Sequence, residues 1–218
     1  LPWRVCDRVT GIEMVLIPPG KYMRGALPGD DEANEDERPS HEVTVTKPFY
    51  LGVYPVTQRQ WTKAVSSDPS EFKGQDLPVE TVSWTDVDQY LQAAKGLRLP
   101  TEAEWEYACR AGSSRARYGA LNDIAWHAGN SRGSTHPVGG QRSNSFGLHD
   151  MLGNVMEWWS DWYGAYPRGH LVDPTGPASG SNRICRGGAW GYSGKSCRAS
   201  SRLGVSPSSR GRLLGFRV

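Results

Sequence analysis

The chain has 218 residues, of which 37% are hydrophobic and 22% charged, as expected for one large globular domain. Its net charge of +2 at pH 7 lacks the basic footprint of nucleic-acid-binding proteins, and no apolar run approaches the ~20 residues of a membrane span. The 26 Gly and 15 Pro argue for a turn-rich fold and against a helical bundle.

The first residues contain no basic segment followed by an apolar run, so the sequence predicts no signal peptide. The default compartment is then the cytoplasm, with display at a surface as the alternative. The four cysteines, Cys6, Cys109, Cys185 and Cys197, form no C-x-x-C pair, which argues against zinc and thioredoxin-type chemistry. Buried thiols, disulfides and reactive groups all stay open for them.

Short strands are predicted in the first fifth of the chain. Glu13 to Ile17 consists largely of strand-forming residues, and Pro18-Pro19-Gly20 follows it as a turn. Lys21 to Arg24 then reads as the return strand of a hairpin. His41 to Thr46 alternates between apolar and polar residues, which is typical of a half-buried strand.

Three helices are predicted from capping residues followed by apolar residues at helical spacing. The expected pairs of N-cap and third residue are Thr57 with Gln60, Thr85 with Asp88, and Thr101 with Glu104. Gly96 and Gly112 are placed to end the second and third helices, because glycine favours the left-handed conformation at a C-terminus.

The second half of the chain is predicted to be mostly irregular. Ser113 to Gly140 is rich in Gly, Ser and Asn, and loops of this length are usually functional or ion-bound. Asn144 to Trp158 places hydrophobic residues between turn formers and offers no long helix. Asp161 to Ser181 reads as a further Gly/Pro-rich connection.

Charge is distributed unevenly along the chain. The last 36 residues, Arg183 to Val218, contain seven Arg and one Lys but no acid, whereas the preceding residues carry 17 basic and 23 acidic side chains. The acids are densest in Asp30 to Glu37, which holds six of them and reads as a solvated loop, or as a partner for the basic C-terminus or a cation. We expect the C-terminal segment to fold against the acidic remainder.

Two kinds of position alternate in this C-terminal segment. Framework positions are Arg186, Gly187, Gly188, Trp190, Cys197, Arg198, Arg202, Pro207, Arg210, Gly215, Phe216 and Arg217. Unpatterned positions are Gly191, Tyr192, Ser193, Ser196, Ser201, Leu203, Gly204, Val205, Ser209, Gly211, Arg212 and Leu213. The unpatterned positions show no period of 2 or 3.6, so no strand or helix face is predicted there. A framework holding free positions suggests a display surface; the alternative is an irregular Ser/Gly-rich loop.

Several motifs together resemble a known family. They are Pro78-Val79-x3-Ser83-Trp84, Arg98 to Ala108, Asn144 to Trp158, Arg186-Gly187-Gly188 and Gly215-Phe216-Arg217. From about Gly11 to Val218 the chain resembles the formylglycine-generating-enzyme and sulfatase-modifying-factor domain. The resemblance implies a C-type-lectin-like α+β fold, with two to three helices around small twisted antiparallel sheets. We therefore expect a single domain over 1–218, with 183–218 as its variable segment.

The resemblance also bears on activity. Enzymes of this family oxidise a substrate cysteine with copper held by two thiolates, which soft Cu(I) prefers. Their pattern has a serine after the two glycines and then two cysteines, whereas this chain has Ala189, Tyr192 and Cys197. One thiolate cannot make that site, so we expect no copper and no enzymatic activity. A copper thiol oxidase is kept as the alternative, and a purely structural or regulatory module as a third reading.

Another branch of the family is non-enzymatic. It comprises the variable proteins of diversity-generating retroelements, whose C-terminal framework carries scattered positions diversified by adenine-specific mutagenesis. The unpatterned positions consist of residue types reachable in that way, and we predict that they bind an unidentified protein or small-molecule ligand; nucleic acid is not expected. Tyr192, Leu203, Val205, Arg212 and Leu213 would contribute most, although Val205 and Leu213 fit a core role equally well.

The resemblance implies a structural calcium site at Asp150, Gly153, Val155 and Glu157. Two carboxylates and two backbone carbonyls are oxygen ligands suited to a hard cation. The alternative is a hydrogen-bonded turn in which Glu157 pairs with an arginine. The framework arginines are expected to pair with acids from earlier in the chain rather than to bind phosphate.

Overall fold

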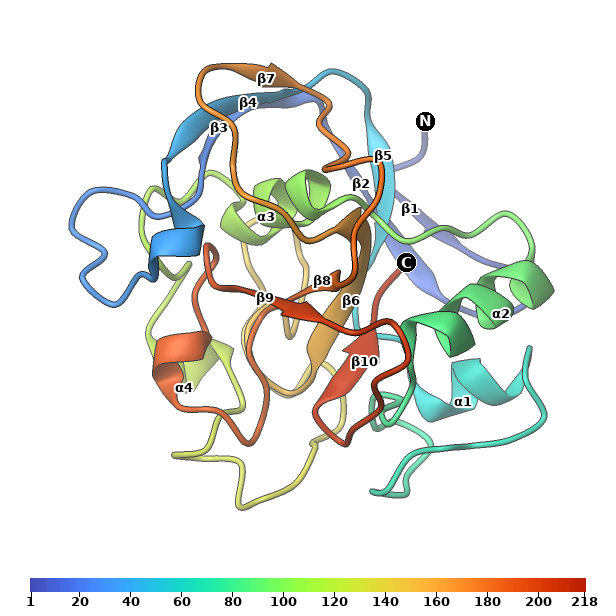
Figure 1. Ribbon diagram of the computed structural model, residues 1–218. Helices are drawn as coiled ribbons and strands as arrows, with labels where there is room; N and C mark the ends of the chain where they lie inside the picture. Colours follow the sequence, from blue (N-terminus) through green and yellow to red (C-terminus); the bar gives the residue numbers. More distant parts are fainter.

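The computed structural model describes residues 1–218, and a four-stranded sheet runs through its middle (Figure 1). Its strands lie in the order β10 (Leu214–Phe216), β6 (Met156–Trp162), β8 (Arg183–Arg186) and β9 (Arg202–Val205). β10 runs parallel to β6, and the other two pairs are antiparallel. The basic C-terminal segment therefore supplies three of the four strands.

Two three-stranded sheets flank the central one. One contains β1 (Arg4–Cys6), β2 (Glu13–Ile17) and β5 (Phe49–Gly52); the other contains β3 (Gly20–Arg24), β4 (His41–Val45) and β7 (Leu171–Val172). The predicted strands are present, but the predicted hairpin is wrong, because β2 pairs with β1 and β5 while β3 pairs with β4. Pro18 and Pro19 carry the chain from one sheet to the next without a tight turn.

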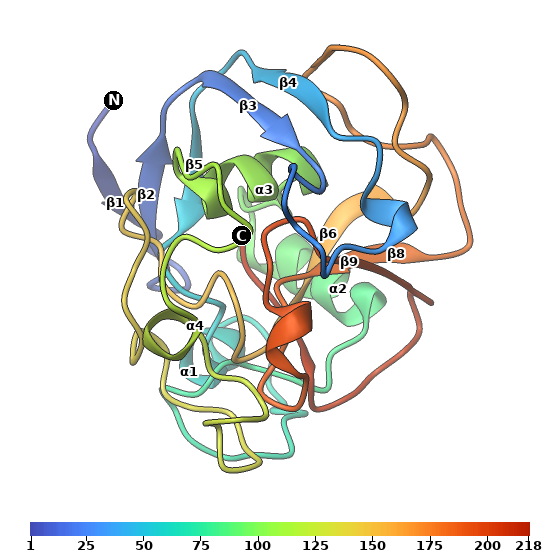
Figure 2. The same cartoon turned by 90° about the vertical axis from the view of Figure 1, so that its left-hand side faces the viewer.

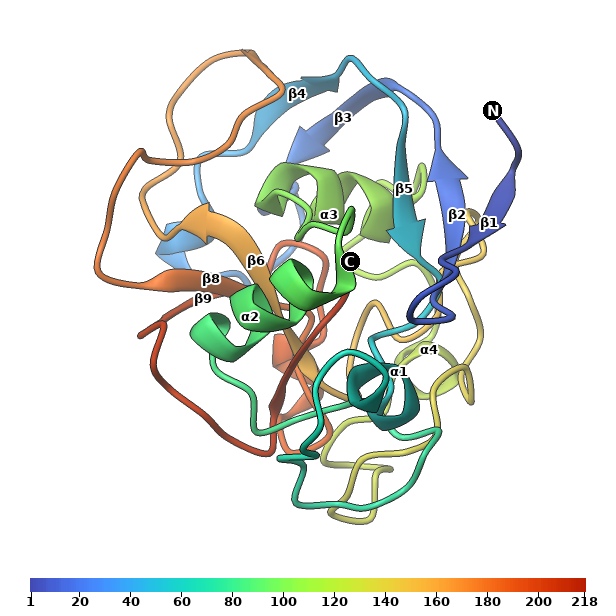
Figure 3. The same ribbon diagram turned by 90° about the vertical axis from the view of Figure 1, so that its right-hand side faces the viewer.

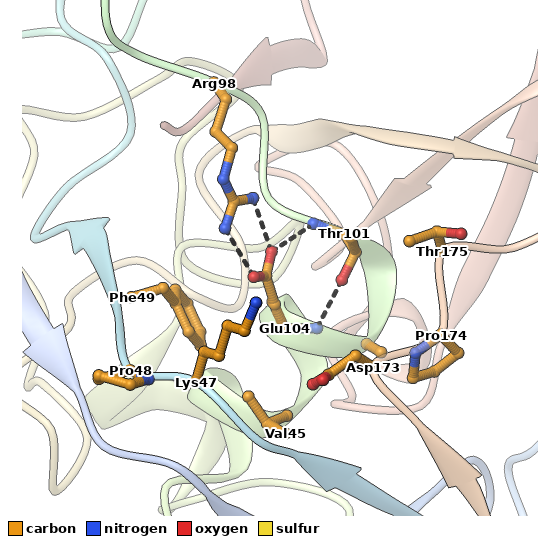
Figure 4. A pocket seen from close by; sticks show the side chains of 11 residues that line it. Val45, Lys47, Pro48, Phe49, Arg98, Thr101, Glu104, Asp173, Pro174 and Thr175 are labelled. Carbon is orange, nitrogen blue, oxygen red and sulfur yellow. Dashed lines mark hydrogen bonds and ion pairs between the residues drawn. The ribbon is translucent and has the colours of Figure 1, made fainter.

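The predicted helices form, with one change in capping. They are α1 (Gln58–Thr62), α2 (Trp84–Ala94) and α3 (Glu102–Arg110). The chain also contains a short helix, α4 (Leu121–Ile124), and two 3-10 turns, η1 (Glu35–Glu37) and η2 (Gly194–Ser196). Thr57 and Thr101 cap α1 and α3 as expected, and Figure 4 shows the reciprocal bonds between Thr101 and Glu104. Ser83, rather than Thr85, caps α2, because Thr85 already lies inside the helix.

The helices attach to the sheets through apolar faces. α3 lies between β3 and β6 and buries Trp105 completely. α1 and α2 lie side by side (Figure 3), where the rings of Trp61 and Tyr90 stack at 5.2 Å and both meet Phe216 of β10 edge-on. The predicted α+β class, with helices around small and mostly antiparallel sheets, is confirmed. None of the helices combines the length and apolarity needed to span a membrane.

Three segments are more regular than the sequence predicted. α4 interrupts the long loop of 113–140 (Figure 2). The 3-10 turn η2 contacts it, because Gly194 lies against the Leu121 side chain. β6 begins inside the segment ending at Trp158. β9 contains three unpatterned positions, so the expectation that no strand forms there is wrong. The strand forms because β9 pairs with β8, although its residues do not alternate between apolar and polar.

A buried charge network joins α3 to the C-terminal segment. The Glu102 carboxylate pairs with Arg24 at 2.5 Å, Arg186 at 3.0 Å and Arg202 at 2.8 Å, and all four side chains are nearly inaccessible. Burial opposes ionisation of Glu102, but the three guanidinium groups hold its pKa at about 2. Because this value lies below the ordinary 4.5, the ionised carboxylate stabilises the fold above about pH 4.5, and that contribution is lost as the pH falls toward 2.

We expect Glu102→Gln to lower the free energy of unfolding by about 3–5 kcal/mol, because it leaves three buried guanidinium groups short of a counter-charge. Glu104→Gln on the same helix is the matched control. Its carboxylate pairs at the surface with Arg98, whose side chain is 57% exposed, so the loss should be under about 1 kcal/mol. Urea denaturation measures both; equal losses would contradict the role given to Glu102.

Candidate ligand-binding surface

The framework arginines of the C-terminal segment are structural. Arg186, Arg198, Arg202 and Arg217 are at most 6% exposed. Arg198 pairs with Asp30 and Glu37 of the acidic segment, Arg217 pairs with Glu157, and Arg186 bonds Glu106 as well as Glu102. The prediction that these arginines meet acids from earlier in the chain is therefore confirmed. Arg210 differs, because its side chain is 59% exposed and pairs with Asp86 at the surface.

None of the twelve unpatterned positions is buried. Gly191, Ser193, Leu203 and Arg212 are exposed, and the other eight are partly exposed: Tyr192, Ser196, Ser201, Gly204, Val205, Ser209, Gly211 and Leu213. Tyr192, Val205 and Leu213 are partly buried and pack against the core cluster, so the choice that the sequence left open for Val205 and Leu213 remains. We call these twelve positions the variable surface, after the role predicted for them.

Four members of the variable surface surround a cavity of about 340 Å³. Tyr192, Ser196, Ser201 and Leu203 line it from the variable surface, and Met156, Cys185, Arg186, Gly187 and Gly188 line it from the framework. Arg202 of the framework and Asn34 of the acidic segment complete the wall of this cavity, which we call the Tyr192 cavity. A pocket with an apolar floor and a few polar groups is the usual form of a ligand site.

Another part of the variable surface lies around Trp190. The indole N–H of Trp190 donates to the carbonyl oxygen of Arg212 at 2.9 Å, and the Arg212 guanidinium lies 5.2 Å from the indole ring. Leu213 reaches back to Gly191, where a Cβ would lie 3.0 Å from its Cδ2. Arg212 also pairs with Glu71 at 3.1 Å. None of these residues lines the Tyr192 cavity, so the variable surface extends beyond it.

The cysteines form no disulfide. All four are free, and no three His, Cys, Asp or Glu side chains gather in a metal-binding arrangement. Cys197 lies beneath Gly188, whose φ of +71° and missing Cβ leave room for the sulfur; a Cβ there would approach within 2.8 Å. Burial raises the pKa of Cys197 to about 12 and that of Cys185 well above its ordinary value, so both are thiols at neutral pH.

The predicted calcium ligands lie on one bend and the start of β6. The Asp150 carboxylate is buried; its Oδ2 accepts from the backbone N–H of Gly139 at 2.6 Å, while Oδ1 has no partner. Burial raises the pKa values of Asp150 and Glu157, and the Asp150 charge raises that of Glu157 further. Glu157 also pairs with Arg217 at 2.9 Å, as the alternative reading expected. The unpartnered buried oxygen of Asp150 is what a cation would satisfy, whereas both oxygens of Glu157 already accept hydrogen bonds from Arg217 and Trp105. The calcium site therefore stays a prediction.

Sequence reasoning missed several residues of the cavity. Asn34, Met156 and Cys185 come from three distant parts of the chain, and nothing in their local patterns marks them as neighbours. One signal for Asn34 was available. It lies within the acid-rich segment Asp30 to Glu37, and this excess of acids predicts that the segment contacts the basic C-terminal segment.

Comparison with known proteins places this architecture in a family. A model described as the sulfatase-modifying factor enzyme 1-like domain matches residues 5–218. Serine/threonine-protein kinase pkn1 of Chlamydia caviae is 33% identical, with the match covering 94% of this chain and 37% of that protein. Formylglycine-generating enzyme of Streptomyces coelicolor is 38% identical, covering 64% of this chain and 51% of that protein. Large parts of both relatives thus have no counterpart here.

Among solved structures, Treponema denticola variable protein 1 is similar over the whole chain. The two share 27% identity and a TM-score of 0.85, covering 100% of this chain and 98% of that one. The family resemblance drawn from the motifs, including its variable-protein branch, is therefore confirmed.

Leucines inside and outside the variable surface should respond differently to truncation. Leu203 is 44% exposed, so we expect Leu203→Ala to change the free energy of unfolding by less than about 0.5 kcal/mol. Leu214 is 7% exposed, and Leu214→Ala should cost about 2–5 kcal/mol because it leaves a cavity. Chemical denaturation compares the two, and a large loss at Leu203 would reassign it to the core.

Proposed function

Because the chain belongs to the sulfatase-modifying factor enzyme 1-like domain family but has Tyr192 where the family's enzymes have the first of two cysteines, we propose that it is a non-enzymatic protein. In this proposal it is a ligand-binding variable protein whose exposed surface residues can be exchanged. In this proposal a diversity-generating retroelement alters the twelve positions of the variable surface. The ligand, a protein or a small molecule, binds across Tyr192 and Leu203 without covalent chemistry.

One observation carries the proposal: the solvent exposure of the unpatterned positions beside a buried framework. All twelve are at least partly exposed, whereas Arg186, Arg198, Arg202 and Arg217 are buried and individually paired. Side chains that face solvent can be exchanged at little cost in stability. The likeness to Treponema denticola variable protein 1 supports the same reading.

The alternative is a copper thiol oxidase, which the 38% identity to a formylglycine-generating enzyme favours. Against it stand Tyr192 at the first cysteine position and Cys197 beneath Gly188. With Tyr192 at that position, the family's pattern supplies only Cys197 of the two sulfurs that Cu(I) prefers.

Two measurements separate these functions. Sequencing the genomic locus should find a near-duplicate of the 3′ coding end that differs only at adenines, beside a reverse transcriptase gene. Titration with Cu(I) should give no stoichiometric complex, and a cysteine-containing peptide should not be oxidised. Stoichiometric copper binding with peptide turnover would overturn the proposal in favour of the oxidase.

We further propose a structural calcium ion held by Asp150, the backbone carbonyls of Gly153 and Val155, and Glu157. The ion would satisfy Asp150 Oδ1 and offset the repulsion between two buried carboxylates. It would also fix the start of β6 against Arg217, without contacting the variable surface.

Calcium added to protein dialysed against a chelator should raise the melting temperature, because a ligand that binds only the folded state stabilises it. Magnesium at the same concentration should do less, since it gives up its waters reluctantly. Asp150→Asn should abolish the calcium response. If calcium still raises the melting temperature of Asp150→Asn, or does not raise that of the wild-type chain, the proposed calcium site at Asp150 is wrong.

A further inference from the structure

A second cavity, of about 370 Å³, lies beside the N-terminus of α3 and contains none of the twelve variable positions. It adjoins the hollow shown in Figure 4, with which it shares Pro174 and Thr175. Its volume falls in the range of about 300–1,000 Å³ typical of small-molecule sites. Arg202 is the one residue that it shares with the Tyr192 cavity.

The inner wall of this cavity carries a guanidinium group with unused donors. Arg24 is 3% exposed, and its only hydrogen bond is the one from Nη2 to Glu102. Its Nε is buried without a partner, and its remaining contact is with the face of Tyr166, 4.5 Å away. Arg202, by contrast, uses Nε and both terminal nitrogens in bonds to Glu102 and to backbone carbonyls. An under-bonded buried guanidinium is costly unless an acceptor reaches it.

Aromatic rings and prolines form much of the remaining lining; Tyr166 itself is buried against Arg24 and Arg202. Trp162 and Tyr166 contribute aromatic rings, and Pro167, Pro174 and Pro177 contribute rigid rims. Such walls exclude water from the Arg24 end and suit a planar hydrocarbon body.

Charge in the wall limits the ligand to one negative charge. Glu102 lies beside Arg24, and the buried Oδ1 of Asp161 has no partner and lies 3.0 Å from where a Cβ on Gly176 would be. Gly176 itself lines the cavity. The Glu102 carboxylate in the wall, with the Asp161 carboxylate buried behind Gly176, opposes a second negative charge on a ligand, whereas the planar fork of one arginine matches a single carboxylate.

We propose that this cavity binds a small organic monocarboxylate, with its carboxylate on Arg24 and its planar apolar body between Trp162, Tyr166 and the prolines. The site belongs to the fixed framework. It therefore stays the same whatever residues occupy the variable surface, and it does not depend on the function proposed for that surface.

Isothermal titration of the full chain with sodium benzoate tests the proposal. We expect saturable binding of one benzoate per chain, and at least tenfold weaker binding of benzamide, which has the same ring but no charge. Inorganic phosphate at equal ionic strength should also bind at least tenfold more weakly. No saturable benzoate binding, or phosphate binding at least as tight, would overturn the assignment.

Three variants locate the site. Ala165→Trp fills the cavity from an exposed position and should abolish binding while leaving the charged network intact. Arg24→Lys keeps the charge but loses the planar fork, and should weaken binding at least tenfold. Tyr192→Ala lies in the other cavity and should bind benzoate as the wild type does. Unchanged binding in Ala165→Trp would overturn the proposal, and this variant decides the matter if Arg24→Lys fails to fold.

Discussion

Pairing of buried carboxylates on α3 with arginines of the C-terminal segment is the interaction on which the rest of the structure depends. Glu102 and Glu106 are inaccessible, and between them they engage Arg186, Arg202 and two arginines from elsewhere. Charges at this depth are tolerated only when they are paired in good geometry. The C-terminal backbone is consequently fixed at its buried arginines, while core residues such as Ile184 and Phe216 hold it between them and the twelve unpatterned positions stay at least partly exposed.

Local signals in the sequence predicted the helices and much of the pairing between charges. Capping boxes at Thr57 and Thr101 are complete within four residues, so no tertiary information is needed to find them. The lack of acids after Arg183 likewise predicted that its arginines would meet acids from earlier in the chain. The strand partners were not predictable in this way, because β2 and β3 are neighbours in sequence but join different sheets.

The same distinction applies to the candidate site. Absence of period correctly predicted that side chains such as Tyr192 and Leu203 are not buried, but it wrongly excluded a strand at β9. β9 is an edge strand that is hydrogen-bonded to β8 on one side. It needs no apolar face of its own, so its sequence shows no alternation of apolar and polar residues. The cavity floor was also invisible, because Met156 and Cys185 come together only when β6 and β8 pair.

The long sequence separation of these ion pairs has a consequence for how the chain acquires its structure during synthesis. Arg198 reaches Asp30 across 168 positions, and Arg202 reaches Glu102 across 100. Until Arg183 to Val218 has been synthesised, Glu102 has only Arg24 and Glu106 only Arg110 as a partner, and β6 lacks its neighbours on both sides. Closure of such distant contacts is slow, and the waiting intermediate exposes unpaired strand edges. The segment from Arg183 to Val218 thus closes the fold, because three strands of the central sheet and the partners of the distant acids all depend on it.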